Sequence, residues 1–150
     1  PENDGGAYRA QLEKEIVQHQ LQDRVLMAEE VKDMAAALML ADLIVAPYLE
    51  PATYNRVIIE AQALGRPVVA SDFANAREVL DGSSMAWLVP PGDAMALGWA
   101  IRDALSLPLD EREARTGQVI DNVRQRADRL VMTDSMLSLY GHLTSADQAA

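Results

Sequence analysis

One carboxylate in the sequence stands out because its neighbours are apolar. Glu60 interrupts the segment Arg56–Leu64, which also contains Val57, Ile58, Ile59, Ala61 and Leu64. The spacing predicts a helix that is buried on both sides. A buried carboxylate is costly unless something satisfies it. We therefore expect Glu60 either to bond to nearby protein groups or to face a polar ligand.

The segments around this helix predict the unit from which parallel sheets are built. Two apolar runs, Leu43–Ala46 and Pro67–Ala70, flank the helix, so the order is strand, loop, helix, strand. The loop Pro47–Asn55 leaves the carboxyl end of the first strand and opens the helix. In open α/β sheets this edge is where ligands bind, because helix amino termini point unpaired N–H groups there.

The composition limits the classes of function. The chain has 150 residues, of which 49% are apolar, enough for one domain with a core. Its formal net charge of −10 argues against a nucleic-acid partner. The absence of cysteine excludes disulfides and thiolate metal sites and fits a cytoplasmic protein. We expect no metal site, because His19 and His142 lie far apart, and no transmembrane segment, because no apolar run is long enough.

Helices and strands alternate along the chain, which predicts an α/β domain over residues 1–143 with a mainly parallel sheet and helices on both faces. Further strands are predicted at Arg24–Ala28 and Ala86–Val89. Further helices are predicted at Ala7–His19, Val31–Leu40, Ala76–Leu80, from the N-cap Asp93 to Leu105, from the N-cap Asp110 to Leu130, and at Thr133–His142. We expect Trp87 and Trp99 to lie in the core and residues 144–150 to form a frayed tail.

Four blocks in this sequence resemble a known family. ADLIVAP, RVIIEAQALGRPVVASD, AREVL and WLVPPGD follow one another between Ala41 and Asp93. They resemble the carboxyl-terminal, donor-binding half of the retaining glycosyltransferases built from two Rossmann-like domains, the group 1 or family-four members of the GT-B kind. The resemblance extends from about Asp4 to about Tyr140. It implies a Rossmann-like domain that binds a nucleotide-sugar as a substrate, with no further cofactor.

The resemblance also implies site residues. Glu60 matches the second of two family glutamates and would accept hydrogen bonds from the ribose hydroxyls. Backbone N–H groups near Asn55 and Arg56 would face the diphosphate, while the Arg56 side chain either contacts phosphate or lies in solvent. The other positions that the resemblance places at the nucleotide-sugar are Tyr54, Val31 and Asp33. No catalytic residue is assigned.

The sequence departs from the family on the loops at the ligand edge. The first family glutamate is replaced by Ala52. Family glycines are replaced by Glu29, Asn55, Ala74, Asn75 and Ala86. These changes suggest a site that has changed specificity or decayed. Two hypotheses follow: a glycosyltransferase that transfers a sugar to an acceptor, and a degenerate, non-catalytic relative that acts as a binding or assembly module.

Parts of the family pattern are missing from this sequence. A first strand and loop with an Arg and a Lys, a second strand, and the acceptor domain have no counterpart here. We therefore expect a fragment that is inactive alone, with an acceptor sugar or lipid-linked glycan held by the missing domain. The resemblance implies a bacterial, cytoplasmic enzyme of polysaccharide biosynthesis, which the missing part could bring to the inner membrane as a peripheral protein.

Overall fold

The structure is a computed structural model that describes residues 5–29, 31–51, 55–127 and 129–147. The chain forms two compact units, residues 1–32 and 33–150. The first contains α1 (Gly5–Gln18). The second contains α2 (Met34–Leu40), β1 (Ile44–Ala46), α3 (Arg56–Ala63), β2 (Val68–Ser71), α4 (Ala74–Leu80), β3 (Ala86–Val89), α5 (Ala94–Ser106), α6 (Leu109–Ala127) and α7 (Arg129–Asp147). The single domain over residues 1–143 stays a prediction. None of the described helices combines the length and the apolar character needed to span a membrane.

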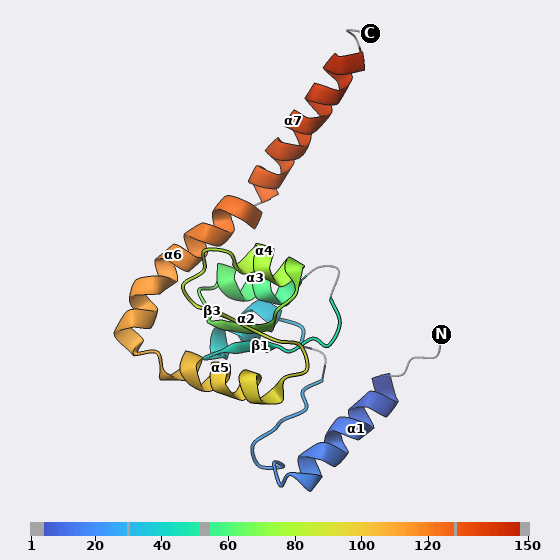
Figure 1. Ribbon diagram of the computed structural model, residues 1–150, viewed down its shortest axis with the longest axis vertical. Helices are drawn as coiled ribbons and strands as arrows, with labels where there is room; N and C mark the ends of the chain where they lie inside the picture. Colours follow the sequence, from blue (N-terminus) through green and yellow to red (C-terminus); the bar gives the residue numbers. More distant parts are fainter. Residues whose placement is uncertain (1–4, 30, 52–54, 128, 148–150) are drawn as a thin grey trace. The chain divides into compact units, whose positions relative to one another are not determined.

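The sheet of the second unit is parallel, as predicted. Among the described residues, three strands pair in the order β1, β2, β3 (Figure 1). Ile44 lies opposite Val68, and Val68 lies opposite Ala86. Every residue of β2 is buried, because this strand has a neighbour on each side and helices above and below it. A short apolar run without alternation is the sequence pattern that such a strand requires.

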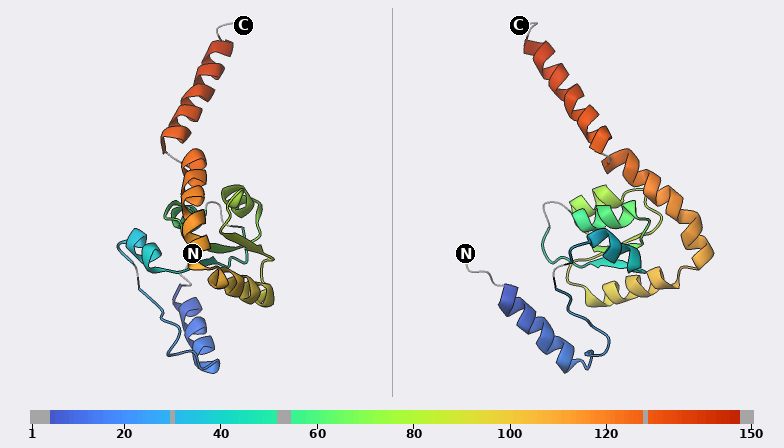
Figure 2. Two further views of the ribbon diagram at one scale, coloured as in Figure 1. Left: turned by 90° about the vertical axis from the view of Figure 1, so that its left-hand side faces the viewer. Right: turned by 180° about the vertical axis from the view of Figure 1, so that it is seen from behind.

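Helices cover both faces of the sheet, which confirms the predicted Rossmann-like α/β class. Successive side chains of a strand point to opposite faces, so Val68 and Ala70 meet the core under α3 and α4, while Val69 meets the core under α5. Figure 2 shows α5 on one side of the sheet and α3 with α4 on the other. The first core also contains Ala46, Ile58, Ala61, Ala76 and Leu80, and the second contains Val89, Ala100 and Ala104.

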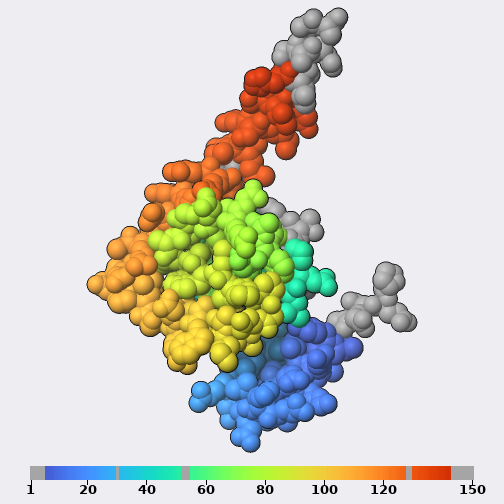
Figure 3. Space-filling view, viewed as in Figure 1, coloured from blue at the N-terminus to red at the C-terminus, as the bar shows by residue number. Residues whose placement is uncertain are grey.

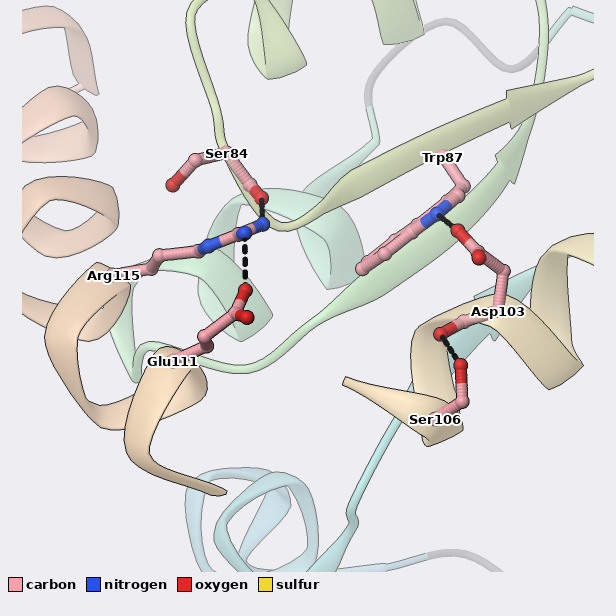
Figure 4. A network of polar contacts seen from close by, with 6 residues as sticks. All are labelled: Ser84, Trp87, Asp103, Ser106, Glu111 and Arg115. Carbon is pink, nitrogen blue, oxygen red and sulfur yellow. Dashed lines mark hydrogen bonds and ion pairs between the residues drawn. The ribbon is translucent and has the colours of Figure 1, made fainter. Parts of the chain in front are cut away.

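The charged helix α6 is fixed to the α/β layers by a buried stripe and by arginines. Val119 and Val123 are its buried residues. Arg115 donates from Nη1 to the carbonyl oxygen of Ser84 at 3.1 Å and from Nη2 to Glu111 at 2.6 Å (Figure 4). One stripe of this helix is therefore structural, and only the remainder is the solvated surface that its charge pattern indicates.

A buried amide links α3 to the start of β3. Gln62 is 1% exposed. Its Nε2 donates to the carbonyl oxygen of Arg66 at 2.9 Å and to that of Met85 at 3.5 Å, and its Oε1 accepts from the hydroxyl of Ser83. These groups lie in the turn before β2 and in the segment before β3. Their hydrogen bonds to Gln62 therefore fix the position of α3 relative to the strands.

Two predictions about element boundaries are wrong. Residues 24–28 form no strand within their unit; Val25 instead donates its N–H to the carbonyl of Leu21 in a local turn. An extended segment becomes a strand only when a neighbour supplies ladder partners, and the resemblance assigns those neighbours to missing strands. Asp110 is not an N-cap, because α6 begins at Leu109 and the carbonyl of Pro108 accepts from Arg112. Asp110 lies in the first turn, where a negative charge is favourable.

The predicted core position of Trp99 is also wrong. Trp99 is 61% exposed on the outer face of α5, where the guanidinium of Arg102 lies 4.9 Å from the centre of its ring. Figure 3 shows α5, in yellow, at the surface. Small residues fill the buried stripe of the helix. Trp87, by contrast, is half-buried and donates to Asp103 at 2.6 Å (Figure 4).

The end of the chain is more helical than its sequence predicted. The predicted final helix ended at His142, whereas α7 continues to Asp147. Four residues of the predicted frayed tail, 144–147, are therefore helical. Serine, threonine and alanine lack a strong helix-breaking effect, and neither proline nor glycine follows Gly141 to stop the helix.

The turn after α3 generates a stability prediction. Gly65 has a φ of +66°, and a Cβ added there would lie 2.5 Å from Cγ2 of Thr116. We expect Gly65→Ala to lower the free energy of unfolding by about 1–3 kcal/mol, through backbone strain and this clash. The cost should be smaller in a Thr116→Ser background, which removes the methyl group. Denaturant unfolding of the wild type, Gly65→Ala, Thr116→Ser and the double variant measures both effects.

The matched control is Gly98→Ala in α5, where an added Cβ would meet no atom within 4 Å beyond its chain neighbours and the backbone of its own helix. This change should stabilise the protein by about 1 kcal/mol, because alanine favours a helix interior. An equal cost of Gly65→Ala in both backgrounds would contradict the assigned contact with Thr116.

Candidate functional site

Helix α3 begins where the loop from the carboxyl end of β1 meets the α/β layers. Asn55 is its N-cap, and the carbonyl oxygen of Asn55 accepts from the N–H groups of Ile58 at 3.1 Å and Ile59 at 3.2 Å. The first N–H groups of a helix have no partner within the helix. They give this edge of the sheet the donors and partial positive charge that bind an anion.

Glu60 lies one turn into α3 and is paired with Arg56. The distance from Nη2 of Arg56 to Oε1 of Glu60 is 3.1 Å. The Glu60 side chain is 39% exposed and that of Arg56 is 78% exposed. The predicted burial of α3 on both sides is therefore wrong, because this stripe of the helix faces solvent. Glu60 has a protein partner and remains accessible to a ligand, so both sequence-based alternatives for it fit the geometry.

Two other predicted site residues belong to other segments of the chain, and a third lies outside the described residues. Asp33 is the N-cap of α2, where its Oδ1 accepts from the N–H of Ala36 at 2.9 Å. Val31 is 40% exposed and belongs to the first unit. Tyr54, like Ala52, lies outside the described residues. The structure thus brings together Asn55, Arg56 and Glu60 at the start of α3.

A cavity of about 460 Å³ opens beside α3. It lies between α3, α4 and the junction of α6 with α7, which Figure 1 shows side by side. Its lining residues are Asn55, Ile59, Asn75, Glu78, Val79, Val123, Arg126, Ala127 and Met132. Sequence reasoning missed the wall from α6 and α7, because no local spacing connects those residues to the loop at Asn55.

Asn55 is the most unusual residue of the cavity wall. It is 4% exposed, and its side chain makes no capping hydrogen bond although it occupies the N-cap position. Its Oδ1 is buried and has no hydrogen-bond partner among the described residues. A buried acceptor without a donor costs free energy, so this atom calls for an explanation beyond helix capping.

An ion pair fixes the next loop at the same edge of the sheet. Asp72 follows β2 and donates its N–H to the carbonyl of Val89 at 2.8 Å. Its carboxylate accepts from Nε and Nη2 of Arg77 in α4, the latter at 2.7 Å. This hydrogen bonding lowers the pKa of Asp72 and raises the pKa of Arg77. The pair therefore links the loop after β2 to α4, which forms another wall of the cavity.

The described part of the chain contains no group of three or more His, Cys, Asp or Glu residues that could hold a metal ion. The candidate site therefore consists of a helix start, an exposed carboxylate with its arginine, and an adjoining cavity. A Rossmann-like sheet with such a helix at its carboxyl edge defines the class of Rossmann-like α/β domains, whose ligands commonly bind at this edge.

Comparison with known proteins assigns the chain to a family within that class. The family described as "Glycosyl transferases group 1" matches residues 4–106. The chain therefore belongs to the group 1 glycosyltransferase family. This confirms the coarser part of the resemblance, while the retaining mechanism and the position within a longer enzyme remain to be tested.

Two relatives agree with this assignment, and a solved structure has the same fold. The chain is 43% identical over 67 residues to a phosphatidyl-myo-inositol mannosyltransferase of Mycobacterium leprae, covering 45% of this chain and 18% of that protein. It is 31% identical over 133 residues to the amylovoran biosynthesis glycosyltransferase AmsK of Erwinia amylovora, covering 82% of this chain and 31% of that protein. The chain thus spans less than a third of these relatives. Anabaena Alr3699/HepE, solved with UDP, has the same fold, with a TM-score of 0.83 at 22% identity over 91% of this chain and 37% of that one.

The Asp72–Arg77 pair predicts an acid titration. An NMR titration of the Asp72 carboxyl group should give a pKa below the usual 3.8. In Arg77→Met the pKa should rise toward that value. A lowered native pKa stabilises the fold at a pH above the unfolded value of about 3.9, and this contribution is lost as the pH falls through the native pKa. Arg77→Met should therefore lose less stability on acidification than the wild type.

Arg124→Met on the exposed face of α6 is the control for loss of an arginine, because Arg124 pairs, within the described part of the chain, with Asp121 of the same helix at 3.7 Å. It should leave the pKa of Asp72 unchanged. An identical Asp72 titration in the wild type and in Arg77→Met would show that the pair does not form in solution.

Proposed function

We propose that this chain is the carboxyl-terminal, donor-binding part of a retaining GT-B glycosyltransferase of family four, and that it holds a nucleotide-sugar at the start of α3. The observation that carries the proposal is the position of Glu60. Its half-exposed carboxylate lies one turn from the N–H groups that open α3, at the edge of the sheet where Asn55 follows β1. Family membership and the UDP held by HepE support a nucleotide as the ligand.

In this proposal, different residues bind different parts of the nucleotide-sugar. The N–H groups at Asn55 and Arg56 bind the diphosphate, because a helix start favours negative charge. Glu60 accepts hydrogen bonds from the ribose hydroxyls, and its partner Arg56 orients it. Tyr54, Val31 and Asp33 remain proposed contacts of the donor.

The reaction exchanges one bond to the sugar for another. The bond between the sugar carbon and the diphosphate oxygen breaks, a bond to the acceptor oxygen forms, and the diphosphate leaves with the bonding electrons. Donors at the start of α3 stabilise the charge that develops on the leaving group. We assign no residue of this chain to the proton transfer from the acceptor hydroxyl.

The acceptor belongs to another part of the enzyme in this proposal. The curated relatives are several times longer than the segment that this chain matches, which leaves room for a domain that binds an acceptor sugar or a lipid-linked glycan. The name of the mannosyltransferase relative supports a lipid-linked acceptor. We propose a cytoplasmic enzyme that reaches the inner membrane as a peripheral protein through that part.

The Glu60 assignment predicts a selective loss of nucleotide affinity. Glu60→Gln in the full-length protein should weaken binding of a nucleoside diphosphate by about tenfold to a hundredfold, because charge-assisted hydrogen bonds to the ribose are lost. The melting temperature should change little, because an exposed pair of this kind contributes only a few tenths of a kcal/mol. Isothermal titration calorimetry and thermal unfolding measure the two effects.

Glu113→Gln on the exposed surface of α6 is the matched control, and it should leave affinity unchanged. Unaltered nucleotide affinity in Glu60→Gln, together with a clear drop in melting temperature, would make Glu60 structural and contradict the proposal.

Because the proposal assigns donor binding to this chain and acceptor binding to another part of the enzyme, it predicts that the 150-residue chain alone transfers no sugar. Without an acceptor domain, the two reactants cannot be held in reacting geometry. Incubation with a panel of nucleotide-sugars and acceptors, followed by mass spectrometry, should detect no glycosylated product. Turnover by the purified chain would contradict the assignment of acceptor binding to another part of the enzyme. A full-length protein that binds nucleotide-sugars but never transfers a sugar would favour the degenerate binding module.

A further inference from the structure

A second pocket, the α5 pocket, opens at the carboxyl edge of the sheet on the face that α5 covers. Its volume is about 190 Å³. The segment after β1, the ends of β2 and β3 and the start of α5 form its walls, with lining residues that include Pro47, Ser71, Val89, Asp93, Ala94 and Leu97. It shares no lining residue with the cavity beside α3 and none with the proposed diphosphate and ribose contacts. It is therefore a separate space at the edge where ligands of parallel sheets bind.

Ser71 places a hydroxyl without a partner in this pocket. It is the last residue of β2 and is 4% exposed. Val69 packs under α5, and Ser71, two residues further along the strand, points to the same face. The Ser71 hydroxyl forms no hydrogen bond within the described part of the chain. It is also not one of the unpaired side-chain atoms that solvent cannot reach. A ligand in the α5 pocket can therefore reach this hydroxyl.

The start of α5 adds donors and an acceptor. Asp93 is the N-cap, and its Oδ1 accepts from the N–H of Ala96 at 2.9 Å, while its carbonyl oxygen accepts from the N–H of Leu97 at 3.0 Å. The N–H groups of Ala94 and Met95 come before these bonds and have no acceptor within the helix. The second carboxylate oxygen of Asp93 is a further acceptor. The pocket thus combines N–H donors, an acceptor, and a hydroxyl that can be either.

The size and charge of the pocket limit its ligand. Its volume corresponds to about six water molecules at roughly 30 Å³ each, which is too small for a nucleotide. The described lining residues include no Lys, Arg or His, and the carboxylate of Asp93 lies among them, so a phosphate is disfavoured. Val89, Pro90 and Leu97 contribute apolar wall. A small neutral group with several hydroxyls and C–H faces fits these conditions.

We propose that the α5 pocket binds one neutral sugar residue of the reaction, with a sugar hydroxyl bonded to Oγ of Ser71. This inference rests on the proposed function, which places the nucleotide at the start of α3. The loop that begins at Pro47 ends at Asn55, so one loop borders both the pocket and the nucleotide site. Two sugars have the required chemistry, the one carried by the nucleotide donor and a sugar of the acceptor.

The test separates the two sugars on the full-length protein. Calorimetry first finds the nucleoside diphosphate and the matching nucleotide-hexose that bind the wild type best. If the donor sugar occupies the pocket, Ser71→Ala should weaken the nucleotide-hexose by about threefold to tenfold and leave the nucleoside diphosphate unchanged.

The acceptor is tested with the methyl glycosides of glucose, mannose and galactose, added to protein saturated with the nucleoside diphosphate. If an acceptor sugar occupies the pocket, one of these probes should shift the methyl NMR signals of Val89 and Leu97. Ser71→Ala should then weaken that probe by a similar factor and leave both nucleotide affinities unchanged.

Further measurements keep the test independent of folding. Because the Ser71 hydroxyl has no internal partner, Ser71→Ala should not lower the melting temperature. Ala94→Leu narrows the pocket from α5 without removing a polar side chain and should also lower sugar affinity. Ser106→Ala is the matched control, since it removes a hydroxyl at the other end of α5, where Oγ donates to the carbonyl oxygen of Asp103. It should leave every ligand affinity unchanged.

Two outcomes would overturn the inference in different ways. Unchanged nucleotide-hexose affinity in Ser71→Ala and Ala94→Leu, with no methyl glycoside shifting the signals of Val89 and Leu97, would exclude the α5 pocket as a sugar site. Intact nucleotide binding in that experiment would leave the proposed function standing. Failure of the wild type to bind any nucleoside diphosphate would remove the proposed function and this inference with it.

Discussion

The parallel pairing of β2 with strands on both sides is the constraint on which the rest of the second unit depends. All four residues of β2 are buried, so helices must cover both faces of the sheet. Parallel neighbours also require a crossover after each strand, and here each crossover is a helix. The helix that follows β1 must therefore begin at the carboxyl edge of the sheet. The position of α3, and with it that of Asn55 and Glu60, follows from this topology.

The backbone and the side chain of Asn55 behave differently at the start of α3. The carbonyl oxygen of Asn55 accepts the first hydrogen bonds of the helix. The Asn55 side chain makes no capping hydrogen bond, and its buried Oδ1 has no partner among the described residues. The loop after β2 is fixed in a different way, by the Asp72–Arg77 pair. The two loops at the carboxyl edge of the sheet are thus held by different contacts, the backbone of a helix start and a side-chain ion pair.

Most of the fold could be predicted because the apolar patterns and the residues that end helices and strands indicate the same boundaries. The apolar run Ala86–Val89 stands between a turn and the sequence PPGD, and β3 has the predicted bounds. Asp93 caps α5 as predicted. The strand at Arg24–Ala28 could not be judged from the sequence, because β structure depends on a partner strand and apolar character alone cannot supply one. Trp99 was misplaced because the apolar residues of α5 exceed the single stripe that the sheet buries.

The candidate site was predictable only where one segment forms it. Asn55, Arg56 and Glu60 lie within two turns of one another, so helical spacing and the family resemblance could find them. The cavity depends on Arg126 and Met132, which come from α6 and α7. Their relation to Asn55 exists only after folding, and no pattern around either residue indicates a ligand.

The most direct measurement is a crystal structure of the full-length protein with the nucleoside diphosphate that binds it best. The account predicts the diphosphate within hydrogen-bond distance of the N–H groups at the start of α3, with a ribose hydroxyl on the carboxylate of Glu60. A nucleotide bound elsewhere, with α3 and Glu60 unoccupied at saturating ligand, would contradict it.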